Sequence, residues 1–343
     1  MKIAIVGAGF FGLTLGLILS KKHKVEIFEK DKSIMHGASC ANQFRFHLGY
    51  HYPRSQKTVS EINKSKDLFV SYFGENIFGK TSNYYLVAKE SKVKFNRYKK
   101  FLKKNKLFFK ISKDIFKKNF IEKCILSNEK ILDYFNFKKK IIKKINNSNI
   151  SLNFNQEFEK KYLKKFDKVI IATYANNNSV LKKLGIKKLN EFKFELVEKI
   201  LVKLPKKFKK KSYVVVDGNF VCVDPYLGTN YHLLSDVKNS KLETKIGKFP
   251  IFKHKNNKYV NRGIIKNLKV SQFTNFLSRS SDYLPFLKDA KYIGSMFVVR
   301  AIMKNKEKTD ERTSIIKIHS KKIISILSGK WNNSVYLAKS LKI

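Results

Sequence analysis

The chain has 343 residues, enough for about two domains. Hydrophobic residues make up 43% and aromatic residues 13% of the chain, which excludes a disordered tail or a fibrous protein. The formal net charge is +47, which excludes an acidic protein. This charge favours an anionic partner, such as nucleic acid, an anionic membrane surface or an acidic substrate.

The excess charge comes mostly from lysine, because only seven of the 73 basic residues are Arg. Specific recognition of phosphates and bases relies on the planar fork of Arg. The chain is also rich in Asn, Ile, Phe and Tyr, which share AT-rich codons with Lys. We therefore expect no nucleic-acid partner, and we keep a peripheral contact with the inner face of a membrane as an open alternative.

The three cysteines, Cys40, Cys124 and Cys222, are an odd number and have no CxxC or Cys/His spacing. This pattern predicts neither a disulfide framework nor a metal site. It favours a reducing compartment, the cytoplasm.

Residues 3–19 form an apolar run that a signal peptide or a short membrane span could also contain. The glycines favour a different structure, because Gly7, Gly9 and Gly12 form Gly-x-Gly-x-x-Gly between a β-branched stretch and a helical pattern. Gly7 permits a tight turn, Gly9 lets the backbone approach a pyrophosphate, and Gly12 lets the helix pack closely on the strand. We expect this helix from Phe10 to about Lys21, with phosphates at its N-terminus.

The second predicted strand lies within residues 24–30 and ends at Glu29. A carboxylate there accepts hydrogen bonds from both hydroxyls of an adenosine ribose and repels a 2′-phosphate. Strand, glycines, helix and acid together predict a dinucleotide-binding α/β fold. They do not decide whether the cofactor is NAD or FAD.

Residues 36–55 carry small residues followed by a polar loop. Gly37-Ala38-Ser39 and His47-Leu-Gly-Tyr50 resemble, in order and spacing, the FAD-dependent oxidoreductases of the D-amino-acid oxidase and glycerol-3-phosphate dehydrogenase superfamily. The resemblance implies FAD as the cofactor. It also implies contacts to FAD from Ala38, Ser39 and Arg45.

Two later segments resemble the same superfamily. Residues 166–173 resemble its second flavin motif and imply a cofactor contact at Thr173, although Tyr174-Ala175 follows where the family usually has Gly. Residues 323–339 resemble a strand, a Gly-Gly-Lys turn and a helix, with Ser328 in place of the first glycine. This closing motif implies cofactor contacts from Gly329, Lys330 and Trp331.

The closing motif has a chemical rationale, because a reduced flavin carries negative charge at its N1–C2=O edge. Backbone N–H groups at the start of the Trp331 helix, with or without Lys330, would stabilise that charge. Asn332 or Asn333 would cap the helix or bind the ribityl chain.

These motifs predict a Rossmann-type FAD-binding domain with a parallel sheet, discontinuous in sequence, and a mixed α+β substrate or cap domain. The FAD-binding domain takes residues 1–75, 131–184 and 291–343. The cap takes residues 76–130 and 185–290.

Sequence patterns add detail to both predicted domains. In the first we expect a helix over 134–145 and a third parallel strand over 149–154. In the second we expect strands at 212–217 and 220–224, with turns at Asp217-Gly218 and Asp224-Pro225. The helix should turn one apolar face inward: Phe135, Phe137, Ile141, Ile142 and Ile145.

Residues 89–145 hold 20 basic and 5 acidic residues, interleaved with aromatics. Such a stretch is compatible with binding nucleic acid or a membrane surface. We favour a solvated helical face with its aromatics turned to the core, because periodic aromatics more often pack than bind. The aromatics are Phe95, Tyr98, Phe101, Phe108, Phe109 and Phe116.

Arg300 is the best candidate to bind a substrate carboxylate or phosphate. It ends the apolar run of residues 293–299, where solvation alone explains an arginine poorly. The alternative is an ion pair with Asp310 or Glu311.

His47 and His51 are candidate catalytic bases or flavin neighbours. If their segment is extended, they share one face with Arg45 and Gly49. Packing within the loop is the alternative. Weaker candidates are Tyr50, Tyr52, Arg54 and His232.

The sequence therefore predicts an FAD-dependent oxidoreductase that oxidises a C–N or C–O bond of a small, acidic substrate of the amino-acid or hydroxy-acid type. Substrate identity and electron acceptor are left open. The alternatives are a flavin-dependent, mutase-like carbohydrate-modifying enzyme, an NAD dehydrogenase, and a basic nucleic-acid or membrane-surface binding protein with a vestigial nucleotide fold.

Overall fold

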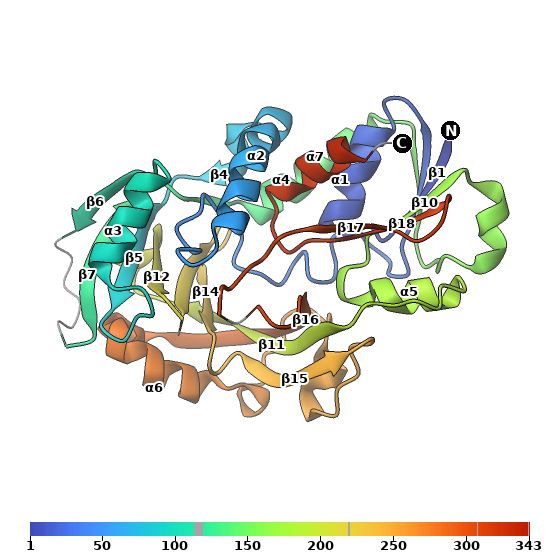
Figure 1. Ribbon diagram of the computed structural model, residues 1–343. Coiled ribbons are helices and arrows are strands. Elements are labelled where there is room, and N and C mark those ends of the chain that lie inside the picture. Colours follow the sequence, from blue (N-terminus) through green and yellow to red (C-terminus); the bar gives the residue numbers. More distant parts are fainter. Residues whose placement is uncertain (113–118, 219, 307, 342) are drawn as a thin grey trace.

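A computed structural model describes residues 1–343 apart from 113–118, 219, 307 and 342 (Figure 1). Its first unit is a six-stranded sheet, called here the parallel sheet, in the order β17-β18-β10-β1-β2-β9. All its neighbouring strands are parallel except β17, which runs antiparallel to β18. The strands are β1 (Lys2–Val6), β2 (Lys24–Phe28), β9 (Ile150–Asn153), β10 (Lys168–Ile171), β17 (Ile315–Ile318) and β18 (Ile323–Leu327).

The predicted turn between the first strand and helix is confirmed. Helix α1 (Phe10–Leu19) follows β1, and Gly7 has φ +104°, a conformation that a side chain would strain. A Cβ atom on Gly12 would lie 1.9 Å from the carbonyl oxygen of Gly7. The helix can therefore lie this close to the turn only because residue 12 is glycine.

Helices cover both faces of the parallel sheet. Ile3 and Ile5 of β1 belong to the same buried cluster as α1, whereas Ala4 and Val6 pack with α5 (Asn177–Lys183). On the α1 face lie α2 (Gln56–Phe73), α4 (Tyr134–Asn146) and α7 (Asn333–Ser340) (Figure 1). Aromatic rings of α1, α2 and α4 pack with Trp331, which lies just before α7: Phe10, Phe69, Phe73 and Phe137.

The expected inward face of α4 is only partly right. Phe137, Ile141 and Ile145 are buried, but Phe135 and Ile142 are 38% and 40% exposed. Positions 137, 141 and 145 repeat every four residues and lie along one stripe, from which 135 and 142 are rotated away. The third parallel strand is confirmed as β9, which pairs with β2.

The second unit is a nine-stranded mixed sheet, called here the large sheet. The order is β15-β11-β14-β13-β12-β5-β7-β6, with β16 also paired to β11. The strands are β5 (Ser82–Ala88), β6 (Phe109–Ser112), β7 (Ile121–Ser127), β11 (Phe192–Lys203), β12 (Lys211–Val216), β13 (Val221–Tyr226), β14 (Tyr231–Asp236), β15 (Lys241–Gly247) and β16 (Lys291–Ile302). A small third sheet joins β3 (Arg45–Phe46), β8 (Lys130–Leu132) and β4 (Phe78–Gly79).

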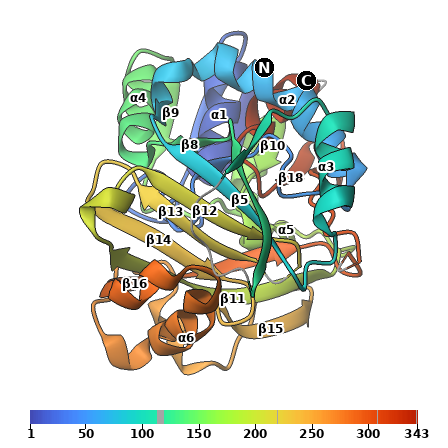
Figure 2. The same cartoon turned by 90° about the vertical axis from the view of Figure 1, so that its left-hand side faces the viewer.

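The large sheet lies between two layers. Figure 2 shows α6 (Phe273–Tyr283) on one side of it and α1, α2 and α4 on the other. Phe276 of α6 packs in one buried cluster with Ile200 of β11, while Leu201 of β11 belongs to the cluster of α1. Both faces of β11 are therefore buried.

Helix α3 (Phe95–Lys104) carries part of the basic stretch. It buries Phe95 and Tyr98, so these aromatics pack into the core as favoured. Phe108 is 55% exposed, and Phe116 lies outside the described residues.

Two expectations about the second unit are wrong. Residues 291–302 were assigned to the FAD-binding part, but β16 pairs along its length with β11 of the large sheet. The turn expected at Asp224-Pro225 is absent, since both residues lie inside β13 and Pro225 pairs with His232. The sequence pattern of β16 does not specify which sheet it joins, and β13 continues through Asp224-Pro225 to Tyr226. The rest of the domain division stays a prediction.

Within the described part of the chain, no helix is long and apolar enough to cross a membrane. The same residues include no group of three or more His, Cys, Asp or Glu side chains placed to hold a metal ion.

Candidate active site

A cavity of about 930 Å³ lies between the parallel sheet and the large sheet. One end is formed by Gly7 and Gly9 at the start of α1. The other end is formed by side chains of β11 and β16, including Lys199 and Arg300. Most of the residues expected to form the site line this cavity: Gly7, Gly9, Glu29, Ala38, Ser39, Arg45, His47, His51, Thr173, Arg300, Gly329 and Trp331.

The glycine end presents backbone groups next to the Glu29 carboxylate. Glu29 accepts hydrogen bonds from the amides of Ala8 (2.8 Å) and Asp31 (3.0 Å), which fixes its carboxylate at the cavity wall. The first turn of α1 contains no acidic side chain. The positive end of the helix dipole therefore faces the cavity without a competing negative charge from its own first turn.

The loop that carries Ala38 and Ser39 crosses the start of α1. The Ser39 hydroxyl accepts a hydrogen bond from the Phe10 amide at 2.9 Å. A Cβ atom on Gly9 would lie 3.4 Å from the Ser39 oxygen. Ser39 is therefore next to the backbone expected to approach the pyrophosphate, while its own contact with a cofactor stays a prediction.

The second flavin motif keeps its turn without the usual glycine. Thr173 lies beside Gly7, with its Cγ2 3.1 Å from where a Gly7 Cβ atom would be. Tyr174 takes φ +54°, in the left-handed region that favours glycine. The backbone thus adopts the conformation that glycine would provide, and both residues line the cavity.

In the closing motif, the backbone faces the cavity and the lysine does not. Gly329 and Trp331 line the cavity. The Lys330 ammonium donates a hydrogen bond to the Arg312 carbonyl and lies 4.7 Å from the centre of the Tyr52 ring. Burial lowers the pKa of Lys330 to about 7. The structure therefore favours the alternative in which backbone N–H groups act without the lysine.

Asn332 and Asn333 connect the closing helix to its neighbours. The Asn332 amide donates to the His47 carbonyl at 3.0 Å, and the Asn333 amide donates to Glu61 at 2.9 Å. The expected side-chain cap is not formed by Asn332 at the start of α7. Asn332 instead holds the segment that carries His47.

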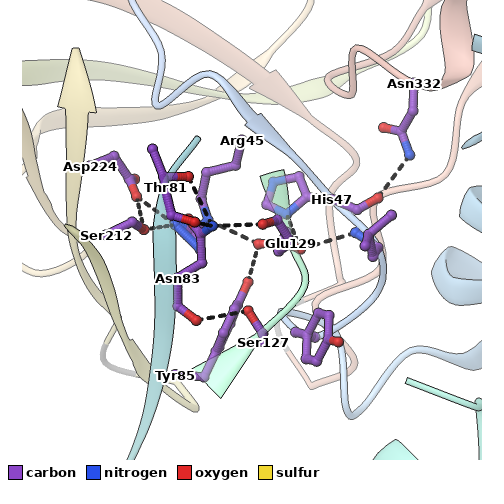
Figure 3. Close-up of polar contacts among 12 residues, drawn as sticks. Arg45, His47, Thr81, Asn83, Tyr85, Ser127, Glu129, Ser212, Asp224 and Asn332 are labelled. Atoms are coloured by element: carbon purple, nitrogen blue, oxygen red, sulfur yellow. Dashed lines mark hydrogen bonds and ion pairs between the residues drawn. The ribbon is translucent and has the colours of Figure 1, made fainter. Parts of the chain in front are cut away.

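Arg45 is at the centre of a buried ionic network (Figure 3). Its guanidinium donates to Glu129 at 3.0 Å and to Asp224 at 2.5 Å. Glu129 also accepts from the Tyr85 hydroxyl at 2.5 Å. Burial opposes the ionised carboxylate, but Arg45 and His47 hold the pKa of Glu129 well below its usual range. The contact from Arg45 to a cofactor stays a prediction.

His47 and His51 lie together, with ring centres 5.4 Å apart, and both line the cavity. The condition of an extended segment is not met, because β3 ends at Phe46 and Gly49 takes φ +122°. A turn therefore brings the two rings together.

The two histidines differ in their surroundings. His47 has its Nδ1 3.7 Å from a Glu129 oxygen. His51 stacks on Phe220, with ring centres 4.4 Å apart. Burial, with smaller effects from His47 and Arg45, holds the pKa of His51 well below its usual value. Of these two histidines, His47 is the one beside a carboxylate, and it is therefore the candidate base.

Arg300 lines the cavity but already has a carboxylate partner. Its Nε donates to Glu195 at 2.9 Å. The ion pair considered with Asp310 or Glu311 is wrong, because strand register places Glu195 of β11 directly opposite Arg300 of β16. Asp310 instead pairs with Arg312 at 2.5 Å.

The weaker candidates lie in different places. Tyr52 and Arg54 line the cavity, and Arg54 pairs with Asp217 at 2.6 Å. The Tyr50 hydroxyl donates to Asn128 at 2.6 Å, outside the cavity lining. His232 also lies outside the lining, with Nε2 3.0 Å from the Phe208 carbonyl oxygen.

Sequence reasoning missed the charged face of β11. Lys193, Glu195 and Lys199 alternate along this strand and line the cavity. Their signal in the sequence is charged residues at every second position, interrupted by Val197, within an otherwise apolar strand. Glu129 was also missed, because no motif surrounds it.

Comparison with solved structures finds this fold among flavoenzymes. Glycine oxidase from Geobacillus kaustophilus aligns with a TM-score of 0.72 and 14% identity, over 97% of this chain and 91% of that one. L-α-glycerophosphate oxidase from Mycoplasma pneumoniae, solved with FAD bound, aligns with a TM-score of 0.70 and 14% identity. The alignment covers 98% of this chain and 92% of that one. This chain has the fold of the D-amino-acid oxidase and glycerol-3-phosphate dehydrogenase superfamily. The resemblance in sequence motifs is thereby confirmed at the level of the fold.

A further structure with this fold, L-proline dehydrogenase from P. horikoshii, aligns with a TM-score of 0.70 and 14% identity over 98% of this chain and 91% of that one.

Curated relatives match shorter segments. FAD-dependent monooxygenase FPY4 from Fusarium mangiferae is 31% identical over 99 residues, 28% of this chain and 27% of that protein. FAD-dependent monooxygenase kojA from Aspergillus flavus is 36% identical over 76 residues, 22% of this chain and 18% of that protein. The chain thus aligns with about a quarter or less of these relatives' length, and no family model matches it.

Proposed function

We propose that the protein is an FAD-dependent oxidoreductase that oxidises a C–N or C–O bond of a small acidic substrate, an amino acid or a hydroxy acid. The observation that carries the proposal is the continuity of the cavity. It runs from the glycine turn at α1 to the charged face of β11 and β16. A dinucleotide and a small polar molecule can therefore meet inside it.

The lining fits FAD. The glycine turn exposes backbone beside a helix N-terminus, Glu29 at the cavity wall would bind a ribose, and Trp331 also lines the cavity. Several buried polar atoms of the lining have no hydrogen-bond partner among the described residues, including Gln43 Oε1 and Asn261 Oδ1. A polar ligand would provide those partners.

When bound, FAD supplies the acceptor for a hydride from the substrate carbon. The protein's own groups orient the substrate and move a proton. Arg300 is placed to attract an acidic group, although it shares its charge with Glu195. His47, whose Nδ1 lies 3.7 Å from a Glu129 oxygen, would accept the proton of an amine or hydroxyl.

The test is anaerobic reduction of the purified yellow protein by a panel of amino acids, hydroxy acids and sugar derivatives. Loss of the flavin absorption with an acidic member is the expected result. Turnover of a sugar derivative without any electron acceptor would favour a mutase instead. Salt-sensitive binding to nucleic acid or anionic lipid, with no flavin reduction by any compound, would favour a binding protein.

A further inference from the structure

Lys199 is a buried cation at the charged end of the cavity. It lies on β11, is 8% exposed, and lines the cavity wall. Its ammonium donates a hydrogen bond to the Ser235 hydroxyl on β14 at 2.8 Å. The function proposed above gives this lysine no role.

The immediate surroundings of Lys199 do not favour a charge. On the same face of β11 its neighbours are Val197 and Leu201, which are 2% and 0% exposed. Across the strand pair it faces Met296 of β16, which is 4% exposed. Burial, with a smaller contribution from Arg300, lowers the pKa of Lys199 to about 8, against opposing effects of Cys222, Asp224 and Glu195.

The carboxylates near Lys199 already hold other cations. Asp224 binds Arg45 at 2.5 Å, and Glu195 binds Arg300 at 2.9 Å. Burial raises the pKa of Cys222 to about 12, so its thiol remains neutral and supplies no negative charge. Within the described residues, no ion pair joins Lys199 to a carboxylate.

Buried lysines are rare unless a partner compensates the charge, because removing an ammonium from water is costly. A hydrogen bond to Ser235 alone could be made by a neutral side chain at much lower cost. The missing negative charge is therefore best supplied by something that enters the cavity. A single ammonium beside a single hydroxyl suits a carboxylate, whereas a phosphate dianion needs more donors.

We propose that Lys199 and Ser235 form a subsite that binds a carboxylate of the substrate. This inference rests on the proposed function and specifies it. The substrate carboxylate then binds directly at Lys199, and Arg300, which stays paired with Glu195, contributes a weaker attraction.

The test uses the yellow holoprotein and three probes: propionate, its neutral analogue propanamide, and inorganic phosphate. Binding is measured by calorimetry and by the change in flavin absorption. The wild type should bind propionate and not propanamide. Lys199→Met should weaken propionate binding by about 10- to 100-fold, the usual effect of losing a charge-assisted hydrogen bond. Lys203→Met is the matched control, since Lys203 lies on the same strand but is exposed.

The pH dependence gives a second measurement. Propionate affinity should fall as the pH rises above about 8, where Lys199 loses its proton. Lys199→Arg should retain affinity at pH 9 to 10, because Arg keeps its charge. Lys199→Met should also unfold at a higher temperature than the wild type, since it removes a buried charge.

Each other outcome has a defined meaning. Three results in a protein that is still yellow would overturn the subsite. They are equal propionate affinity in Lys199→Met and wild type, equal binding of propionate and propanamide, and tighter binding of phosphate than of propionate. A protein that takes up no FAD would instead overturn the proposed function, and the subsite as substrate-binding with it.

Discussion

The two ends of the cavity are formed by different parts of the polypeptide, backbone at one end and side chains at the other. The glycine end uses backbone groups of consecutive residues, from Gly7 to Gly12, at one turn. The charged end uses side chains from separate strands, such as Lys199 on β11 and Arg300 on β16. The first kind of site leaves a motif in the sequence, and the second leaves none, because its residues meet only after the sheet has formed.

The largest effect should come from the backbone end. Gly12→Ala places a Cβ atom 1.9 Å from the Gly7 carbonyl oxygen, so the turn and helix must move apart. We expect complete loss of FAD binding, measured as flavin absorption after reconstitution. Gly247→Ala is the control, because its Cβ atom meets nothing within 4 Å. Normal FAD content in Gly12→Ala would contradict the close packing assigned to this turn.

The buried network joins the two ends and should control stability. Arg45→Met leaves Glu129 and Asp224 without their guanidinium, and breaking a buried ion pair in this way costs about 3–5 kcal/mol. The free energy of unfolding, from urea titration, should fall by that amount. A loss below about 1 kcal/mol would show that these carboxylates do not depend on Arg45.

His47 tests the chemistry between the two ends. His47→Asn should keep FAD bound and slow anaerobic flavin reduction by about 100-fold or more, the usual contribution of a general base. His319→Asn is the control, because His319 contacts Ser325 outside the cavity lining. An unchanged rate in His47→Asn, with full FAD content, would remove His47 from the role of base.

The smallest of these effects is expected at Arg300. Arg300→Ala should keep the yellow colour and weaken reduction by acidic substrates by about tenfold, because Arg300 shares its charge with Glu195. Arg300→Lys is a second variant that keeps a cation beside Glu195, so it controls for misfolding of Arg300→Ala. Exposed Arg97 provides the control, as Arg97→Ala. Unchanged substrate affinity in both Arg300 variants would exclude it from substrate binding.

Local patterns predicted local structure well. The first strand, the glycine turn, α1 and the location of β9 follow from residues close in sequence. The strand before the closing motif is confirmed as β18, and α7 follows it. Errors arose where a pattern did not specify the partner strand, as at β16, or where apolar residues lie beside the buried stripe, as at Phe135.

The charged parts of the candidate site could not be predicted in this way. Arg45 meets Glu129 across 84 residues of sequence, and Arg300 meets Glu195 across 105. Such pairs depend on strand order and register, which a single sequence does not specify. Lys199 looks in the sequence like any other lysine of a strongly basic chain. Only the packed sheet shows that it is buried.

The most direct test of the central claim is the stoichiometry of nucleotide binding by the purified protein. We predict that it binds one FAD per chain, measured by calorimetry and by flavin absorption after gel filtration, and that NAD does not displace it. Binding of NAD with no uptake of FAD would contradict the account, because the closing motif at Gly329 and Trp331 would then line a cavity for a different cofactor.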